Sequence, residues 1–166
     1  AHNLRDLAEY TGRRYPKIKW ILAHCARSFT YWPIRQAVER LRDMPNIWYD
    51  LSAVTDIRPF ITLFQKEDLS RLMYGSDGIC ACSFHGQYVA LGRAWQGLQT
   101  DRIELRFPHC DGRPIISLYE QLLSMKHAAE IAGLSRDDIE AIFWRNACDA
   151  FDLDSAAGAD RVASRA

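Results

Sequence analysis

The stretch Ile18-Lys19-Trp20-Ile21-Leu22-Ala23 runs directly into His24, and a second stretch, Leu72-Met73-Tyr74-Gly75-Ser76, runs directly into Asp77. The first is a near-continuous apolar run, which is typical of a strand buried on both faces of a parallel sheet. Parallel α/β enzymes build their active sites at the carboxyl ends of such strands. A histidine and an aspartate at these two positions therefore predict a catalytic edge of a sheet.

Three predicted strands repeat at a regular interval. They are expected over residues 18–23, over residues 47–52 and over a segment that ends at Asp77. His24, Asp50 and Asp77 then lie at strand ends separated by 26 and 27 residues. This interval matches repeated βα units of a parallel sheet. It is compatible with a (β/α)8 barrel and equally with a doubly wound sheet.

Helical periodicity and capping residues predict the elements around these strands. Asn3 caps a first helix that Gly12 and Pro16 end, Pro33 opens a second, and Asp56 caps a third. The apolar stripes that should face the core are Ile34, Val38 and Leu41 in the second helix and Ile57, Phe60, Ile61 and Phe64 in the third. Farther along, a helix runs from Pro114 to Gly133, Ser135 and Asp138 form a capping box, and Asn146 caps a last turn that reaches Phe151.

Two segments depart from this rhythm. Residues 78–113 hold no clear strand or long helix, so we expect a long loop over the site, with a short helix near Tyr88 to Trp95. Residues 154–166 are small and polar, and we expect them to be disordered. Residues 1–153 are then a single domain, in keeping with a chain of 166 residues.

Composition narrows the class of protein. Hydrophobic residues make up 48% of the chain, and the net charge is zero, which supports a packed core and argues against a nucleic-acid surface. No apolar stretch is long enough to cross a bilayer, and residues 3–19 are polar where a signal peptide would be apolar. The five cysteines are scattered, which predicts reduced thiols and a cytoplasmic protein.

Four segments together resemble one family. Residues 17–27 look like the sixth-strand segment of the amidohydrolase-related (amidohydrolase 2) group of metal-dependent TIM-barrel hydrolases, and residues 47–53 resemble its seventh-strand segment. Tyr74-Gly75-Ser76-Asp77 resembles the eighth-strand signature, and residues 134–151, with Asn146-Ala147, resemble the helix that closes family members. The resemblance spans roughly residues 3–153 and implies an α/β fold with about the last three βα units of a (β/α)8 barrel.

One feature of the family is missing from the sequence. Family members carry a His-x-His pair on the first strand and a histidine on the fifth, and this chain has no His-x-His. The resemblance therefore implies a carboxyl-terminal half, whose other half precedes it or lies on another chain. It also implies that most ligands of the divalent metal, expected to be zinc, are absent, so the chain alone should be inactive.

The resemblance assigns roles to three residues. Asp77 is expected to bind the metal or to hold and deprotonate the attacking water, and His24 to ligate the metal or to stabilise or protonate the reacting group. Arg27 is a candidate for binding a substrate carboxylate, although a surface or capping role fits it equally. The alternative to a catalytic Asp77 is a turn-capping aspartate, and the alternative to a catalytic His24 is a hydrogen-bonded core histidine.

Other polar residues have weaker claims. Asp50 and Ser52 alternate onto one face of their strand, and a structural hydrogen bond is the default for both. His85 and His109 are expected in solvated loops and His127 on an exposed helix face. Cys80-x-Cys82 with His85 suggests a metal clip, but the spacing is not C-x-x-C, and the alternative is small residues in a loop.

The implied reaction is metal-assisted hydrolysis of a C–N or C–O bond in a small organic substrate. Decarboxylation of an aromatic or unsaturated acid is a close alternative, because the same family includes decarboxylases. A third alternative is a non-catalytic remnant or an assembly partner that completes another barrel half, either as a homo-oligomer or with a different chain.

Overall fold

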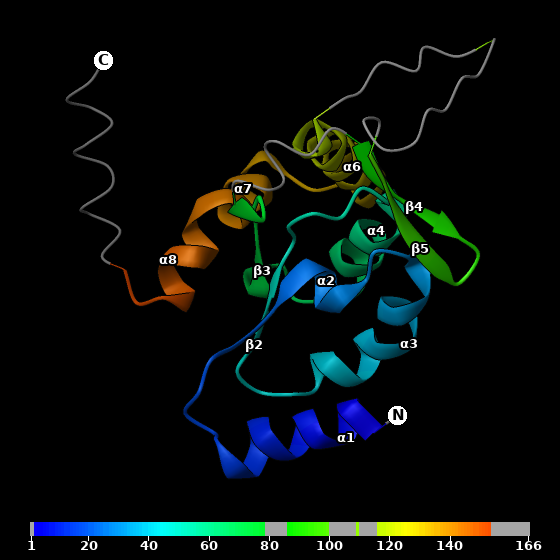
Figure 1. Ribbon diagram of the computed structural model, residues 1–166. Coiled ribbons are helices and arrows are strands. Elements are labelled where there is room, and N and C mark those ends of the chain that lie inside the picture. The colour runs from blue at the N-terminus through cyan, green and yellow to red at the C-terminus, as the bar shows by residue number, and fades with distance from the viewer. Residues whose placement is uncertain (1, 79–85, 100–108, 110–115, 154–166) are drawn as a thin grey trace.

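Three short parallel strands organise the computed structural model, which describes residues 2–78, 86–99, 109 and 116–153 (Figure 1). The strands are β1 (Trp20–Leu22), β2 (Ile47–Asp50) and β3 (Leu72–Met73), hydrogen-bonded in the order β1-β2-β3. Both pairings are parallel, which confirms the predicted βα repeat. The described strands form an open sheet and not a closed barrel.

Helices connect the strands and cover the sheet. Between the strands lie α2 (Ala23–Arg27), α3 (Tyr31–Arg42), α4 (Ile57–Lys66) and the 3₁₀ turn η2 (Leu69–Arg71). The flanking helical elements are α1 (His2–Glu9), η1 (Tyr10–Arg14), α6 (Ser117–Ala132), α7 (Arg136–Glu140), η3 (Ala141–Arg145) and α8 (Asn146–Ala150). Within the described ranges, no helix combines the length and the apolar character that a membrane span requires.

The strands are shorter than the sequence predicted. β1 ends at Leu22 and β2 ends at Asp50, two residues before the expected end of that strand. β3 ends at Met73, four residues before Asp77. The chain leaves the sheet after β3 because the backbone N–H of Tyr74 donates to the carbonyl of Ile142 in η3, at 2.8 Å, instead of to a strand.

Three of the predicted caps are present. The Asp56 carboxylate accepts from the N–H of Arg58, Gly133 ends α6 with a φ of 71°, and Ser135 and Asp138 form the capping box. Two predictions were wrong. Asn3 lies inside α1, and the helix continues through Gly12 to Arg14, because this exposed glycine keeps a helical backbone and costs only entropy there.

The expected short helix near Tyr88 to Trp95 is also wrong. This segment is an antiparallel hairpin of β4 (Gly86–Leu91) and β5 (Ala94–Gln99), with Gly92 at a φ of 63° in the turn. The sequence does contain a signal for this hairpin, because a two-residue turn that begins with glycine lies between segments with β-branched and aromatic residues. The rest of the expected loop, and the 154–166 tail expected to be disordered, lie largely or wholly outside the described residues.

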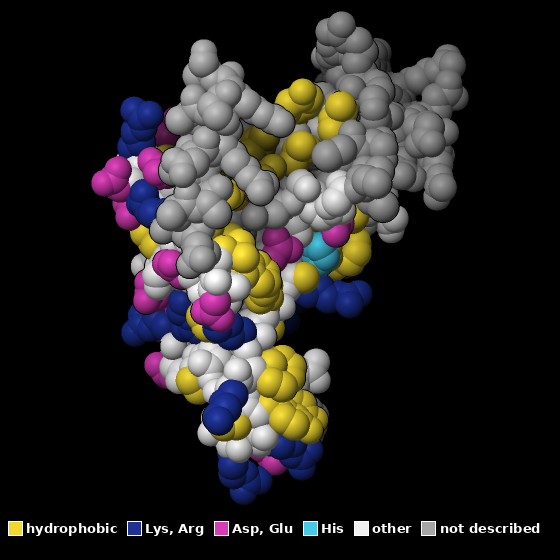
Figure 2. All heavy atoms as spheres, turned by 90° about the vertical axis from the view of Figure 1, so that its left-hand side faces the viewer, with side chains coloured by type: hydrophobic (Ala, Val, Ile, Leu, Met, Phe, Trp, Pro, Cys, Tyr) yellow, Lys and Arg dark blue, Asp and Glu magenta, His cyan; other side chains and the backbone are white. Residues whose placement is uncertain are grey.

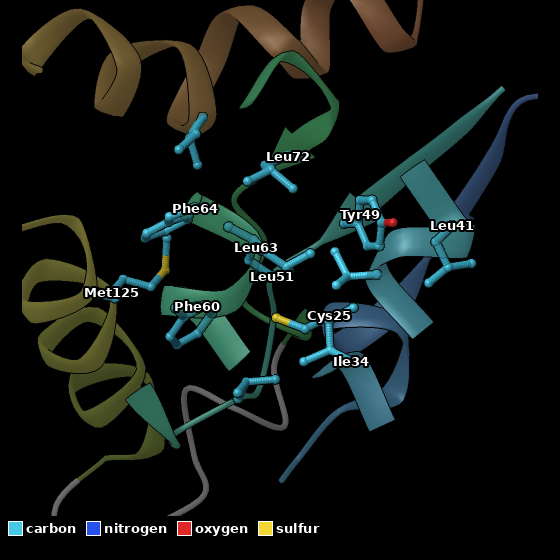
Figure 3. Close-up of a cluster of buried hydrophobic side chains, with 14 of the residues drawn as sticks. Cys25, Ile34, Leu41, Tyr49, Leu51, Phe60, Leu63, Phe64, Leu72 and Met125 are labelled. Atoms are coloured by element: carbon cyan, nitrogen blue, oxygen red, sulfur yellow. The ribbon is translucent and has the colours of Figure 1, made fainter. Parts of the chain in front are cut away.

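The core fills the space between the sheet and helices α3, α4 and α6. Figure 3 shows side chains from all of these elements in one cluster, with Met125 of α6 reaching toward Phe64 of α4. The predicted stripes of α3 and α4 are largely confirmed, since Ile34, Val38, Leu41, Phe60 and Phe64 are buried. Ile61 is only partly buried.

A polar cluster anchors the amino-terminal end of the sheet. The buried hydroxyl of Tyr49 donates to the Glu67 carboxylate at 2.7 Å, and Arg71 pairs with the same carboxylate at 3.0 Å. Arg71 also donates to the carbonyls of Ile47 and Met44. Burial, followed by the Glu67 carboxylate, raises the pKa of Tyr49 far above its usual range, so the phenol stays protonated. This cluster is structural and lies at the opposite end of the strands from the candidate residues.

The outer edge of β3 is covered by the chain's own carboxyl-terminal helices. The side-chain amide of Asn146, which is buried, donates to the carbonyls of Leu69 at 2.7 Å and Leu72 at 2.8 Å. The sequence predicted that Asn146 caps a helix, and this prediction was wrong. Asn146 takes the place that a neighbouring strand's N–H would occupy at Leu72.

Replacing Asn146 with alanine should destabilise the chain. The Asn146→Ala change leaves two buried carbonyls without their donor, which should cost about 2–3 kcal/mol. Urea unfolding followed by circular dichroism measures this loss, with exposed Asp149→Ala in the same helix as the control, expected within about 0.5 kcal/mol of wild type. A neutral Asn146→Ala would mean that the β3 edge is not held by this side chain.

Candidate functional site

A hollow of about 800 Å³ lies beside the carboxyl end of β1. His24, Arg27 and Trp95 all line it, together with apolar side chains of α1 and α3. His24 is half-buried and Arg27 is exposed. The structure thus brings two of the three predicted site residues to one hollow.

The turn that carries His24 has an unusual backbone. Residues His24, Cys25, Ala26 and Arg27 all have φ between 52° and 58°, so α2 is one turn of left-handed helix. It is closed by a hydrogen bond from the Ser28 N–H to the His24 carbonyl at 2.7 Å. For residues other than glycine this conformation costs roughly 1–2 kcal/mol each. Strain of this kind persists where the surrounding structure over-determines it, and it gathers at functional sites.

A hydrogen-bonded chain joins His24 to the end of β2. The His24 Nδ1 atom lies 3.0 Å from the Ser52 Oγ and 3.2 Å from the Ser52 carbonyl oxygen. The Ser52 hydroxyl donates to Oδ2 of Asp50, and the Ser52 N–H donates to Oδ1 at 3.1 Å. The structural hydrogen bond expected from the sequence for Asp50 and Ser52 is present. Through Ser52, the same bonds continue to His24.

Gly75 and Gln121 hold the hydrogen-bonded residues Asp50 and Ser52 in place. A Cβ on Gly75 would lie 2.0 Å from Oδ1 of Asp50, so only glycine leaves room for the carboxylate there. The Gln121 amide of α6, which is buried, donates to the carbonyls of Gly75 at 2.8 Å and Leu51 at 3.1 Å. Its oxygen accepts from the N–H of Ala53 at 3.2 Å. Neither residue has a role that could be recognised from the sequence.

An aromatic cluster fixes the hairpin beside the hollow. The Phe29 ring lies 4.4 Å from Trp95, 4.7 Å from Tyr88 and 5.2 Å from His24, measured between centroids. Thr55 exchanges two hydrogen bonds with the backbone of Tyr88. The hairpin therefore contributes Trp95 to the wall of the hollow and fixes Phe29 against His24.

Cys25 lies next to His24 but does not supply a nucleophile. The residue is fully buried. Burial raises the pKa of its thiol well above the usual range, and the negative charge of Asp50 raises it further. The reactive form of cysteine is the thiolate, so Cys25 acts as a core residue.

The described residues do not fit a complete metal site. Within the described part of the chain, no three His, Cys, Asp or Glu side chains come together to hold an ion. A catalytic zinc takes three protein ligands, and His24 already directs one ring nitrogen to Ser52. The Cys80, Cys82 and His85 side chains of the suggested metal clip lie outside the described residues.

Asp77 does not line the hollow. It is exposed and has a φ of 63°. His109 is exposed, and His127 is exposed and lies 3.2 Å from Glu130 on α6. The predicted role of Asp77 therefore stays a prediction.

A second hollow, of about 370 Å³, lies between α6 and η3. Its walls are largely apolar, with Phe143 and Ile139 exposed at its edge. It lacks the hydrogen-bonded histidine that makes the hollow beside β1 a candidate for chemistry.

The face in Figure 2 mixes Lys and Arg with Asp, Glu and hydrophobic side chains, and its described residues form no field of one charge sign.

Comparison with known proteins places the chain in a family. The amidohydrolase family model matches residues 2–153, and the chain therefore belongs to the amidohydrolase family. Members of this family are typically enzymes of the hydrolase type and are commonly metal-dependent. No curated protein and no solved structure matches the chain significantly.

A glycine in the left-handed turn should stabilise the chain. Ala26→Gly removes the Cβ clash of a positive φ, and the free energy of unfolding should rise by about 0.5–1 kcal/mol. The same change at Ala37, which is also partly buried but lies in α3, should lower it by about 1 kcal/mol. Urea unfolding of the two variants measures the contrast. Equal losses would show that the turn is not left-handed in solution.

Removing the Gln121 amide should loosen the sheet end that carries the candidate site. Gln121→Leu keeps the volume but leaves the Leu51 and Gly75 carbonyls unpaired, which should cost about 2–4 kcal/mol. Lys126→Ala, at an exposed position of the same helix, is the control and should be nearly neutral. Hydrogen exchange should speed up at Ala53, whose N–H bonds Gln121, and an unchanged rate there would contradict this role.

Proposed function

We propose that the chain supplies the carboxyl-terminal half of the active site of a hydrolase that cleaves a C–N or C–O bond in a small organic substrate. The observation that carries the proposal is the placement of His24. It lies two residues after a strand of a parallel sheet, is hydrogen-bonded through Ser52 to Asp50, and lines a hollow together with Arg27. Family membership supports hydrolysis as the reaction class.

Each predicted residue has a task in this reaction. The water oxygen bonds to the electrophilic carbon, the C–N or C–O bond breaks, and one water proton goes to the leaving group. The His24 imidazole takes part in this proton transfer, because a neutral imidazole carries one N–H donor and one acceptor nitrogen. We assign the Asp77 carboxylate to the attacking water as a proton acceptor, and Arg27 to an anionic group of the substrate.

The proposal requires a second half of the site. The described residues lack a complete metal ligand set, so a divalent ion, zinc in our proposal, needs ligands from further strands in addition to His24 and Asp77. We propose that these strands belong to the same polypeptide upstream or to another chain, including a second copy of this one. We further propose that the protein is cytoplasmic and that the described elements are part of a (β/α)8 barrel.

Decarboxylation is the second candidate, and the composition of the hollow favours it. Arg27 provides a positive charge, and Trp95 and Phe29 provide aromatic walls next to His24. A guanidinium binds a carboxylate with paired hydrogen bonds, and flat rings stack on aromatic side chains. These features suit an aromatic or unsaturated acid.

Turnover by the complete gene product tests the proposal. The complete protein should hydrolyse at least one member of a panel of amides, esters and lactones, or release CO2 from an aromatic acid. His24→Gln and Asp77→Asn should each lower kcat by about 10²–10⁴-fold. His127→Gln, an exposed histidine on α6, is the matched control and should leave kcat unchanged.

The isolated chain provides the second arm of this test. It should bind no stoichiometric divalent metal by elemental analysis and should show no turnover. A stoichiometric ion in the isolated chain would contradict the need for a second half. A complete protein that is inactive on every substrate would leave the non-catalytic assembly role in place of the enzyme. An active protein that is unaffected by His24→Gln would refute the role of His24.

A further inference from the structure

We propose that Asp50 and Ser52 are positioning residues that fix one tautomer of His24, with the proton on Nδ1 and the lone pair on Nε2. This inference rests on the proposed function in one respect, because it takes His24 as a reacting group. It adds the identity of the reacting nitrogen, and it assigns a role to two residues at the end of β2.

The direction of each hydrogen bond follows from which atoms carry protons. The Asp50 carboxylate only accepts, so the single hydroxyl proton of Ser52 goes to Asp50 Oδ2. The Ser52 Oγ then has only lone pairs left for the imidazole nitrogen 3.0 Å away. The Ser52 carbonyl oxygen, 3.2 Å from the same nitrogen, also only accepts. His24 Nδ1 faces two acceptors and must carry the proton.

The other tautomer is disfavoured by the same contacts. With the proton on Nε2, the Nδ1 lone pair would face the lone pairs of two oxygens, and both hydrogen bonds would be lost. One ordinary hydrogen bond is enough to shift such an equilibrium about tenfold. A neutral imidazole with its proton on Nδ1 offers Nε2 as proton acceptor or ligand, so the reacting nitrogen is Nε2.

Neighbouring residues hold the Asp50 carboxylate where it accepts the Ser52 hydroxyl proton. A Cβ on Gly75 would clash with Oδ1 of Asp50, and the Ser52 N–H donates to the same oxygen. The Gln121 amide fixes the carbonyls of Leu51 and Gly75 on either side. The carboxylate therefore cannot rotate away from Ser52 without displacing the β3 end. Asp50 acts on His24 through Ser52, not by touching substrate.

Nitrogen NMR of the chain labelled with ¹⁵N-histidine tests the tautomer directly. Spectra are recorded well above the ordinary histidine pKa of about 6.5, so that the imidazoles are neutral. His24 is assigned by its loss in His24→Gln. We expect the proton on Nδ1 by about tenfold over Nε2. A His24 with its proton on Nε2 would overturn the inference.

Two variants should reverse or weaken the preference. In Asp50→Asn the amide N–H₂ replaces Oδ2 and donates to Ser52, whose hydroxyl proton then turns to Nδ1 and moves the imidazole proton to Nε2. Gly75→Ala should act in the same direction by displacing the carboxylate. The ratio of tautomers should fall from about tenfold to near one. An unchanged ratio in a folded variant would contradict the role of Asp50.

Three control variants separate positioning from general damage. Asp43→Asn makes the same substitution at an exposed site, and Gly12→Ala makes the same change as Gly75→Ala where no atom lies within 4 Å of the added Cβ. Both should leave the His24 spectrum unchanged. Ser52→Thr keeps the hydroxyl and should keep the tautomer. A shift in any of these three would indicate a nonspecific effect and refute the assignment.

The complete protein provides a kinetic readout. Asp50→Asn should lower kcat by about 10–100-fold with little change in KM, because it alters the reacting nitrogen and not substrate contacts. Failure of this inference is distinguishable from failure of the proposed function. An inactive complete protein refutes the function and leaves the NMR result standing, whereas an active protein with His24 protonated on Nε2 refutes only the positioning role.

Discussion

One buried carboxamide, that of Gln121, holds together the edge on which the candidate site depends. Its N–H₂ group binds a carbonyl after β2 and a carbonyl after β3, and its oxygen binds an N–H after β2. A buried amide that satisfies three backbone groups at once fixes two loops relative to each other, since any movement leaves a polar group unpaired. Helix α6 thereby sets the spacing of the two strand ends, although it contributes no candidate catalytic residue.

That spacing determines the geometry of the polar chain that ends at His24. With Leu51 and Gly75 both bound to Gln121, the Gly75 Cα lies against the Asp50 carboxylate, and the carboxylate is directed to Ser52. On the other side, the left-handed turn brings the imidazole to Ser52. Full burial of Cys25 and near-full burial of Phe29 offset the strain of this turn.

The fold was predictable where it depends on local patterns. Apolar runs located the strands, and the Asp56, Gly133 and Ser135 caps located helix ends, because each depends on a few neighbouring residues. Gln121 was not predictable, since its partners lie 46 to 70 residues away and a polar residue in a helix ordinarily faces solvent. The Gly75 contact and the Asn146 bonds likewise depend on tertiary structure. The hairpin was missed because its two-residue turn at Gly92 was not recognised as the connection between two strands.

The two predicted catalytic residues differ in what holds them. His24 is positioned within this chain, by Asp50 and Ser52 at the end of β2 and by the residues that hold them. Asp77 lies beyond a β3 strand whose outer edge is covered by Asn146 and η3, and it is exposed. A strand added next to β3 would compete with the Ile142 carbonyl for the Tyr74 N–H and would redirect the segment that carries Asp77. The surroundings of His24 in the candidate site are therefore set within this chain, whereas the position of Asp77 depends on what pairs with β3.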